Sequence, residues 1–218
     1  MAQLDFAERQ LTLKLVYFGP PLSGKTSNLR ALHQRVDRLN RGRLMTLDTR
    51  DDRTLFFDLL PIFFRTTSFS FRIKVYTVPG QPVHEATRKV VLAGADGVVF
   101  VADSGADKAA ANRESWQNLG TSLHAHNLDQ VPIVVQYNKR DVAGCAISEV
   151  DHFDDPARHL FEAEAKAGKG VVPTFFALVS AVWSYLDKDL QLATKLGLDS
   201  QTFRTALAEH VVAGDAVE

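Results

Sequence analysis

An eight-residue segment near the N-terminus has the residue types and spacing of a phosphate-binding loop. Residues 19–26 read Gly-Pro-Pro-Leu-Ser-Gly-Lys-Thr, which fits the pattern Gly-x-x-x-x-Gly-Lys-Ser/Thr. The apolar run before it predicts a strand, and the pattern at 28–32 predicts a helix, which is the context that such a loop requires. Backbone N–H groups and the positive end of the helix would then surround phosphates. A chance glycine-rich turn is the alternative.

The residues of this loop have different expected roles. Gly24 allows a close approach of the backbone, Lys25 would reach the β- and γ-phosphates, and the Thr26 hydroxyl would ligate Mg²⁺. We therefore expect Lys25 to take part in catalysis as well as in binding. The loop residues expected to contact the nucleotide are Gly19, Pro20, Pro21, Leu22, Ser23, Gly24, Lys25, Thr26 and Ser27.

A second polar segment, Asn138-Lys139-Arg140-Asp141, follows a strand-like run and carries groups that can recognise guanine. The Asp141 carboxylate can accept two hydrogen bonds from the ring N–H and the exocyclic amine, which adenine does not present in that arrangement. The Asn138 amide would meet the other edge of the base, and the Lys139 stem would pack on its face. A wrong base would leave a buried carboxylate unpaired, so the segment favours GTP over ATP. A solvated turn, or an ATPase or kinase of another family, is the alternative.

The order of the elements that must position these segments predicts an α/β protein. Strand-like runs alternate with longer helical patterns, which indicates a mostly parallel sheet with helices on both faces. Strands are expected at Leu11–Phe18, Leu44–Asp48, Ser70–Thr77, Gly97–Ala102, Ile133–Tyr137 and Phe161–Ala165. Helices are expected at about 25–39, 83–93, 108–127, 173–187 and 200–212, with 188–199 as a connector. The apolar run 55–64 is either a buried or edge strand or a docking surface for a partner.

The composition is that of an ordinary globular protein and argues against several classes of function. The 218 residues carry 25 Lys and Arg against 26 Asp and Glu, and this balance gives no sign of nucleic-acid binding. Cys145 is the only cysteine, so no internal disulfide can form. No secretory signal, membrane-spanning run or lipidation motif is recognisable, and we expect a cytoplasmic protein without an integral membrane segment.

The chain also resembles one branch of the Ras-like superfamily, the MglA-type bacterial GTPases of gliding motility and cell polarity. The most specific matching stretches are Arg-Thr-Leu-Phe-Phe-Asp at 53–58 and Thr-Val-Pro-Gly-Gln at 77–81. The resemblance covers about residues 10–187. It implies a three-layer P-loop NTPase fold of the Ras type over 1–187, followed by a C-terminal extension, 188–218, with one helix. It also implies Mg²⁺-dependent hydrolysis of GTP to GDP and phosphate, used as a switch; a module that binds GTP or GDP with negligible hydrolysis is the alternative.

The same resemblance implies roles for residues of the two switch segments. Thr54 would contact Mg²⁺ and the γ-phosphate, and Gly80 would donate its backbone N–H to the γ-phosphate. Gln81 would orient the attacking water. Arg53 would act as an arginine finger within the same chain and stabilise the charge of the transition state; a surface arginine beside two aspartates is the alternative.

Residues 161–166 resemble the last base-binding element of the superfamily. Ala165 would donate its backbone N–H to the guanine carbonyl, and Lys166 would cover the base. Glu164 stands where the family usually has Ser. A plain strand end with an exposed lysine is the alternative.

Two positions depart from the pattern of better-known Ras-like proteins. Thr77 replaces the Asp that helps to hold the Mg²⁺ shell through water, and its neutral hydroxyl cannot supply that charge; the replacement is typical of the MglA branch. Pro21 stands where Gly is usual. Since proline lacks an N–H and fixes φ, we expect slow intrinsic hydrolysis that depends on a partner. The resemblance implies a dimeric Roadblock-type, MglB-like activator, and partners could recruit the protein to a cell pole or membrane.

Overall fold

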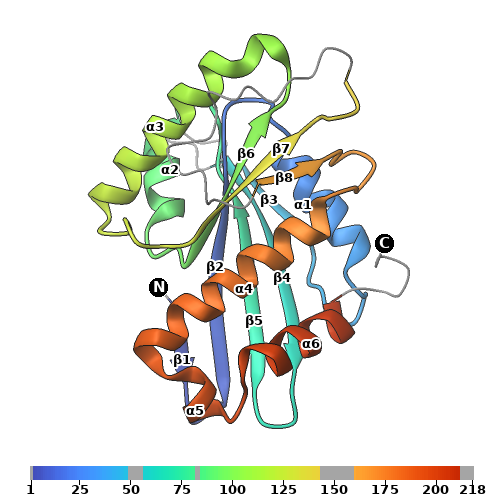
Figure 1. Cartoon of the computed structure of the whole chain (residues 1–218), viewed down its shortest axis with the longest axis vertical. Helices are drawn as coiled ribbons and strands as arrows, with labels where there is room; N and C mark the ends of the chain where they lie inside the picture. The colour runs from blue at the N-terminus through green and yellow to red at the C-terminus, as the bar shows by residue number, and fades with distance from the viewer. Residues whose placement is uncertain (1, 49–55, 82–83, 143–159, 212–218) are drawn as a thin grey trace.

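A computed structural model describes residues 2–48, 56–81, 84–142 and 160–211. Its centre is an eight-stranded sheet in the order β3-β4-β5-β2-β6-β7-β8, with β1 paired to β2 (Figure 1). The strands are β1 (Gln3–Asp5), β2 (Gln10–Phe18), β3 (Met45–Asp48), β4 (Phe56–Arg65), β5 (Ser70–Thr77), β6 (Gly97–Asp103), β7 (Ile133–Asn138) and β8 (Leu160–Ala163). The helices are α1 (Lys25–Arg35), α2 (Glu85–Leu92), the 3₁₀ turn η2 (Ala106–Lys108), α3 (Ala109–Ala125), α4 (Val171–Leu190), α5 (Leu192–Leu196) and α6 (Ser200–Val211).

The sheet is mostly parallel, as the sequence predicts. Strands β5, β2, β6, β7 and β8 pair in parallel, whereas β4 is antiparallel to both of its neighbours. Every residue of β6 is buried, because this inner strand is covered on both faces. Parallel strands bring their carboxyl ends to one edge, so the segments that follow β2, β5, β6 and β7 converge there.

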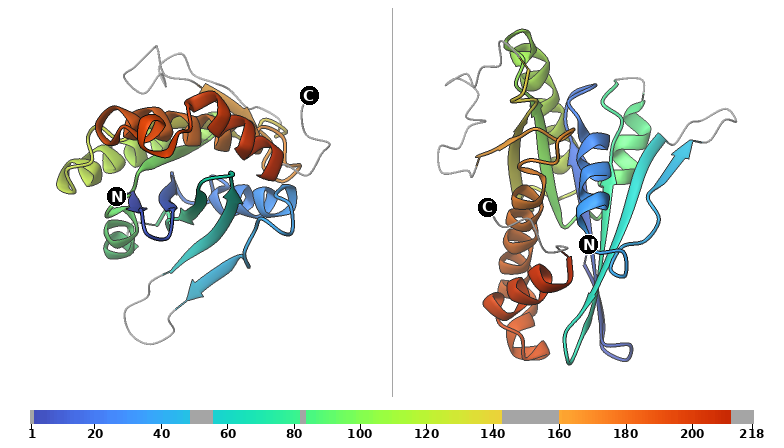
Figure 2. Two further views of the ribbon diagram at one scale, coloured as in Figure 1. Left: turned by 90° about the horizontal axis from the view of Figure 1, so that it is seen from below. Right: turned by 90° about the vertical axis from the view of Figure 1, so that its right-hand side faces the viewer.

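Helices cover both faces of the sheet, which gives the expected three layers (Figure 2). On one face α1, α4, α5 and α6 pack against side chains of β2, β4 and β5 such as Leu13, Ile62 and Ile73. On the other face α2 and α3 pack against Val16, Phe100 and their neighbours on β2, β6 and β7. None of the helices in the described ranges has the length and apolarity needed to span a membrane.

The apolar run at 55–64 forms a strand along its described part. In β4 the side chains of Leu60, Ile62 and Phe64 are buried, while the odd-numbered positions between them are partly exposed. This alternation is that of a strand with one face on the core. Asp58 occupies the same buried register, and its surroundings belong to the candidate site described below.

The C-terminal segment differs from its expected form. Helix α4 extends to Leu190, and α5 occupies 192–196, so the segment 188–199 is not the simple connector that the sequence indicated. The extension therefore holds two helices rather than one. Helix α6 packs its apolar face on β4, at the end of the sheet far from the phosphate loop (Figure 1).

Four fully buried aromatic rings join α6 to the sheet. The ring of Phe203 stacks on Trp183 of α4 with centroids 4.0 Å apart, and it lies 5.3 Å from the ring of Phe71 and 5.6 Å from that of Phe64. All four side chains are at most 2% exposed. Because β4, β5, α4 and α6 each contribute one ring, α6 is an integral part of this core.

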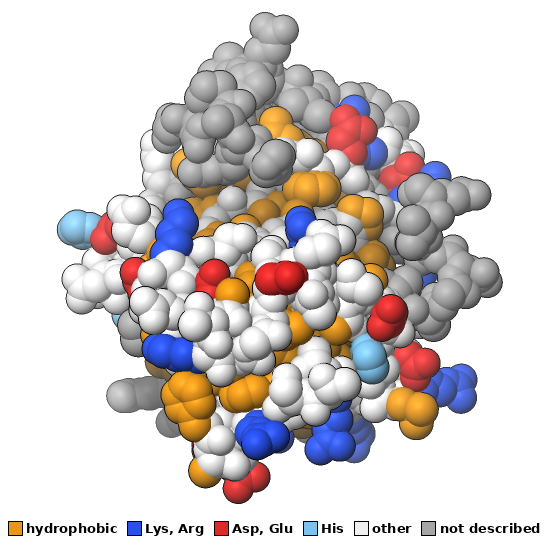
Figure 3. All heavy atoms as spheres, turned by 60° about the horizontal axis from the view of Figure 1, so that its bottom comes forward, with side chains coloured by type: hydrophobic (Ala, Val, Ile, Leu, Met, Phe, Trp, Pro, Cys, Tyr) orange, Lys and Arg blue, Asp and Glu red, His pale blue; other side chains and the backbone are white. Residues whose placement is uncertain are grey.

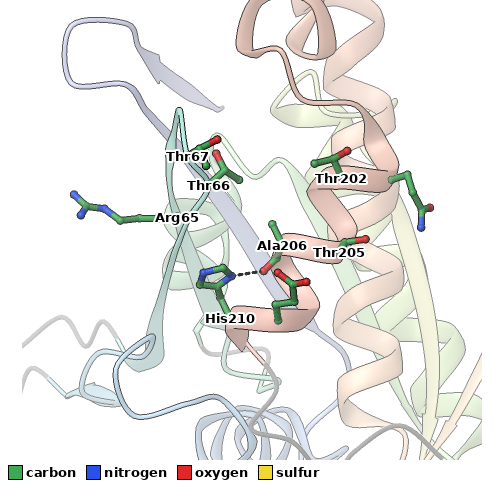
Figure 4. Close-up of a pocket in the computed structure, with 9 residues that line it drawn as sticks. Arg65, Thr66, Thr67, Thr202, Thr205, Ala206 and His210 are labelled. Atoms are coloured by element: carbon green, nitrogen blue, oxygen red, sulfur yellow. Dashed lines mark hydrogen bonds between the residues drawn. The ribbon is translucent and has the colours of Figure 1, made fainter.

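A pocket of about 610 Å³, lined mostly by polar types of residue, lies between α6 and the turn that joins β4 to β5 (Figure 4). Its lining includes Thr66, Thr202 and Thr205, and the His210 ring contacts the carbonyl of Ala206 inside α6. The pocket is remote from the phosphate loop. On the molecular face shown in Figure 3, acidic and basic side chains are both present with hydrophobic ones between them, in keeping with the formal net charge of −1.

Candidate nucleotide-binding site

The phosphate loop connects the end of β2 to the start of α1, which begins at Lys25. Gly24 has φ +101° and Gly19 has φ +148°. A Cβ at Gly24 would overlap the Asn138 amide nitrogen, and one at Gly19 would overlap the Val101 carbonyl. The backbone conformation and the closeness of neighbouring strands therefore require glycine at both positions, whether or not a ligand is bound.

Lys25 turns its ammonium group back over this loop. Its Nζ donates to the carbonyl oxygens of Gly19 at 2.9 Å and Pro20 at 2.7 Å, and the side chain is buried. Burial, assisted by the nearby Arg88 guanidinium, lowers the pKa of Lys25 to about 7. The ammonium is thus held among neutral carbonyls at an electrostatic cost that an anionic phosphate would offset.

Thr26 belongs to a compact group of hydroxyls around one buried carboxylate. Its Oγ1 donates to Asp58 Oδ2 at 2.7 Å, and the Thr77 hydroxyl donates to the same oxygen at 3.0 Å. Thr46 donates to the other carboxylate oxygen at 2.8 Å. Sequence reasoning missed Asp58 as a site residue, although a charged residue in the buried register of an apolar strand is a signal that could have found it.

The segment after β5 lies directly against the phosphate loop. A Cβ at Gly80 would overlap the backbone of Pro20 and Pro21. The carbonyl of Gln81 accepts a hydrogen bond of 2.5 Å from Arg88, whose side chain is only 8% exposed. The structure therefore places Gly80 and Gln81 beside the phosphate loop.

A pocket of about 590 Å³ lies between this segment and the loop. It is lined by Pro21, Leu22, Gly24, Lys25, Thr26, Ser27, Thr77, Val78, Pro79, Gly80, Gln81 and His84. The predicted catalytic residues Arg53 and Thr54 lie outside the described residues.

The predicted base-reading residues meet at the ends of β7 and β8. Asn138 Nδ2 donates to the Ser23 carbonyl at 2.8 Å, and Asn138 Oδ1 accepts the backbone N–H of Ala165 at 2.9 Å. The side chain of Asn138 therefore links the phosphate loop to the segment after β8. The Ala165 N–H, expected to face a guanine carbonyl, is used here within the protein.

The remaining residues of this group lie toward solvent. Lys139 forms an ion pair of 2.6 Å with Asp103 at the end of β6, and its backbone has φ +69°. Asp141 and Lys166 are exposed at the rim. An exposed carboxylate and lysine beside a buried amide form an open edge at which a planar base could enter.

We expect Asn138→Ala to lower the free energy of unfolding by about 1–3 kcal/mol, because it leaves the Ser23 carbonyl and the Ala165 N–H without their buried partner. Urea denaturation followed by circular dichroism measures the change. Asn118→Ala, on the exposed face of α3, is the matched control and should leave stability nearly unaltered. An equal effect of both variants would contradict a linking role for Asn138.

A mostly parallel sheet flanked by helices, with a phosphate loop after its central strand and Asn-Lys-x-Asp at the end of β7, defines the class of Ras-like P-loop GTPases. No protein-family model matches the chain. Among curated proteins, the chain is similar to the Mutual gliding-motility protein MglA of Myxococcus xanthus (strain DK1622), with 39% identity over 196 residues. The match covers 86% of this chain and 99% of that protein.

At this identity and coverage, the chain belongs to the MglA family of Ras-like GTPases. The resemblance seen in the sequence is thus confirmed. Since almost the whole of the relative aligns with 86% of this chain, part of this chain has no counterpart there.

Proposed function

We propose that this chain binds GTP and GDP with Mg²⁺, hydrolyses GTP slowly, and acts as a nucleotide-dependent switch in bacterial polarity or motility. The observation that carries the proposal is the link from Ser23 through Asn138 to Ala165, which ties the phosphate loop to the base-reading segment. A buried lysine at the loop and an Asn-Lys-x-Asp segment joined in this way support one guanine nucleotide lying across both.

The donor groups near the loop fit Mg²⁺, which prefers hard oxygen ligands and usually retains several waters. Thr26, with its hydroxyl, and Thr54 are the residues that would hold it together with phosphate oxygens. Within the described ranges no group of three or more His, Cys, Asp and Glu side chains could hold a metal ion. When bound, Mg²⁺ would neutralise charge on the β- and γ-phosphate oxygens.

In the proposed mechanism the chain's own residues position the reactants. Lys25 holds the phosphates, and Gly80 donates its N–H to the γ-phosphate. Gln81 orients the attacking water, while Arg88 fixes the backbone of Gln81 through its carbonyl. Arg53 stabilises the charge that develops in the transition state. Gly80 lies close to the backbone of Pro20 and Pro21, and because proline fixes φ, these residues limit how the loop can adjust, which supports a slow intrinsic rate.

The relative's name supports a role in motility, and the family resemblance supports activation by a Roadblock-type, MglB-like partner. We propose that the protein works in the cytoplasm and reaches a cell pole or membrane through such partners. A pull-down in the GTP state that fails to recover any Roadblock-type protein would count against this part of the proposal.

Two measurements test the proposed activity. Chromatography of nucleotide extracted from the purified protein should give guanine and no adenine nucleotide. Single-turnover hydrolysis should be slow, and Gln81→Ala or Arg53→Ala should slow it further by roughly 100-fold or more. Arg204→Ala on α6 is the control, since this arginine is exposed and far from the loop.

Binding without phosphate release in wild-type protein would favour the alternative, a binding module with negligible hydrolysis. Unchanged rates in both variants would refute the catalytic assignment of Gln81 and Arg53. Bound adenine nucleotide would refute the guanine assignment itself.

A further inference from the structure

Thr77 is neutral, whereas most Ras-like proteins have a carboxylate at that position. In this protein a carboxylate lies across from it on β4. Strands β4 and β5 are antiparallel, with Leu59 opposite Tyr76, so Asp58 lies directly across from Thr77. The Asp58 backbone N–H donates to the Thr77 hydroxyl oxygen at 3.0 Å, and that hydroxyl donates to Asp58 Oδ2 at 3.0 Å. The carboxylate absent from β5 is therefore present on the adjoining strand, at the opposite position.

The same carboxylate contacts the threonine of the phosphate loop. Asp58 Oδ2 accepts the Thr26 hydroxyl proton at 2.7 Å. A hydroxyl that donates its proton to a carboxylate becomes a better ligand, because its oxygen keeps its lone pairs free and gains electron density. Asp58 thus prepares Thr26 to ligate a divalent cation through oxygen.

Within the described part of the chain, no cationic side chain balances the charge of Asp58. Its side chain is 2% exposed, and the donors to its carboxylate from the described residues are the neutral hydroxyls of Thr26, Thr46 and Thr77. Among the described residues no Lys or Arg forms an ion pair with it. Buried charges are normally paired or placed at a metal site, since desolvation of an isolated carboxylate costs several kcal/mol.

A purely structural role is the competing explanation. Asp58 connects β3, β4, β5 and α1 through three hydroxyls. An asparagine could keep these links at less cost in desolvation, because its amide oxygen can accept from Thr26 and Thr77 while its amide N–H donates to the Thr46 hydroxyl oxygen. A structural link therefore does not require the negative charge. A cation held at Thr26 does require it.

We propose that Asp58 supplies, from β4, the outer carboxylate of the Mg²⁺ site whose usual position on β5 is taken by Thr77. Asp58 acts as a positioning residue: it orients Thr26 and balances the charge of the ion without touching the reacting atoms. This inference rests on the proposed function, because it concerns the Mg²⁺ that accompanies the guanine nucleotide.

The test measures how Mg²⁺ slows the release of fluorescent mant-GDP from the full chain. In wild-type protein, release should slow as free Mg²⁺ rises, and the midpoint of this titration reports Mg²⁺ affinity. Asp58→Asn should raise the midpoint by about 10- to 100-fold, the usual effect of losing an outer partner of a metal ligand. Its release rate in EDTA should match that of the wild type, because nucleotide contacts are kept.

A rescue variant tests whether the Mg²⁺ site needs the negative charge or needs the Asp58 side chain at its own position. Asp58→Asn combined with Thr77→Asp moves the carboxylate across to the opposite position on β5 and should restore most of the Mg²⁺ affinity. Asp96→Asn is the matched control: Asp96 is also a buried carboxylate, it accepts the Lys14 N–H, and its removal should leave the midpoint unchanged. Thr46→Val keeps the charge and removes one donor, so it should raise the midpoint less than Asp58→Asn does.

The outcomes separate this inference from the proposed function. An unchanged or lower midpoint in Asp58→Asn, or a failed rescue with normal GDP binding in EDTA, overturns the inference and leaves the function standing. If wild-type protein binds no mant-GDP, the proposed function fails first. Circular dichroism shows whether Asp58→Asn folds. If it does not, the Mg²⁺ midpoint of Thr46→Val decides, and a midpoint equal to that of the wild type overturns the inference.

Discussion

Replacing Lys25 with alanine is expected to weaken GDP and GTP binding by about 30- to several thousand-fold. The side chain is buried, and its ammonium lies over the loop carbonyls of Gly19 and Pro20, where the phosphates are proposed to sit. Loss of one partner of a buried, hydrogen-bonded charge pair costs about 2–5 kcal/mol, which corresponds to this range of affinities.

The protein should still fold after this change. At neutral pH the Lys25 ammonium is held at an electrostatic cost, since burial lowers its pKa to about 7 and its partners are two neutral loop carbonyls, so its removal relieves that cost. Fluorescence titration with mant-GDP measures the affinity, and circular dichroism checks the fold. Lys195→Ala, at an exposed position of α5, is the control. Equal affinity of the Lys25 variant and the wild type would rule out this phosphate site.

Replacing Phe203 with alanine is expected to lower the free energy of unfolding by about 3–5 kcal/mol, the usual cost of removing a buried aromatic ring. The ring is fully buried, stacks on Trp183 at 4.0 Å and contacts the rings of Phe64 and Phe71. Since these neighbours belong to β4, β5 and α4, collapse around the cavity would disturb the sheet itself. The large effect follows from the position of α6 in the main core.

Differential scanning calorimetry should show a single transition that moves down by about 6–20 °C, from the size dependence of the melting temperature. Arg204→Ala, one residue further along α6, is exposed and should shift the transition little. A small shift for Phe203→Ala, or a separate early transition, would show that α6 unfolds independently of the GTPase core and that the extension is dispensable for stability.

Local sequence patterns were sufficient to predict the phosphate loop and most of the helices and strands around it. The strand before Gly19, the helix from Lys25 and the Asn-Lys-x-Asp segment each follow from residue types within about ten positions, because strand, loop and helix signals are local. The predicted strands β2, β5, β6 and β7 agree with the structure to within about two residues, a usual boundary error.

The secondary structure of the C-terminal part was harder to predict from sequence. The segment 188–199 carries one glutamine, two aspartates and Gly197 among its apolar residues, and a connector was the predicted structure. In the structure Leu192, Leu196 and Leu198 are buried against the main core, and this packing stabilises α5 despite its short length.

The sequence by itself predicted the class of ligand and identified the family, because phosphate and guanine recognition depend on contiguous motifs. Only the tertiary structure decided which distant residues complete the site. Asp58 and Thr77 are 19 positions apart, and Ser23 and Asn138 are 115 apart. Their pairing depends on strand register and on the convergence of loops at one edge of the sheet, and neither is encoded in a local pattern.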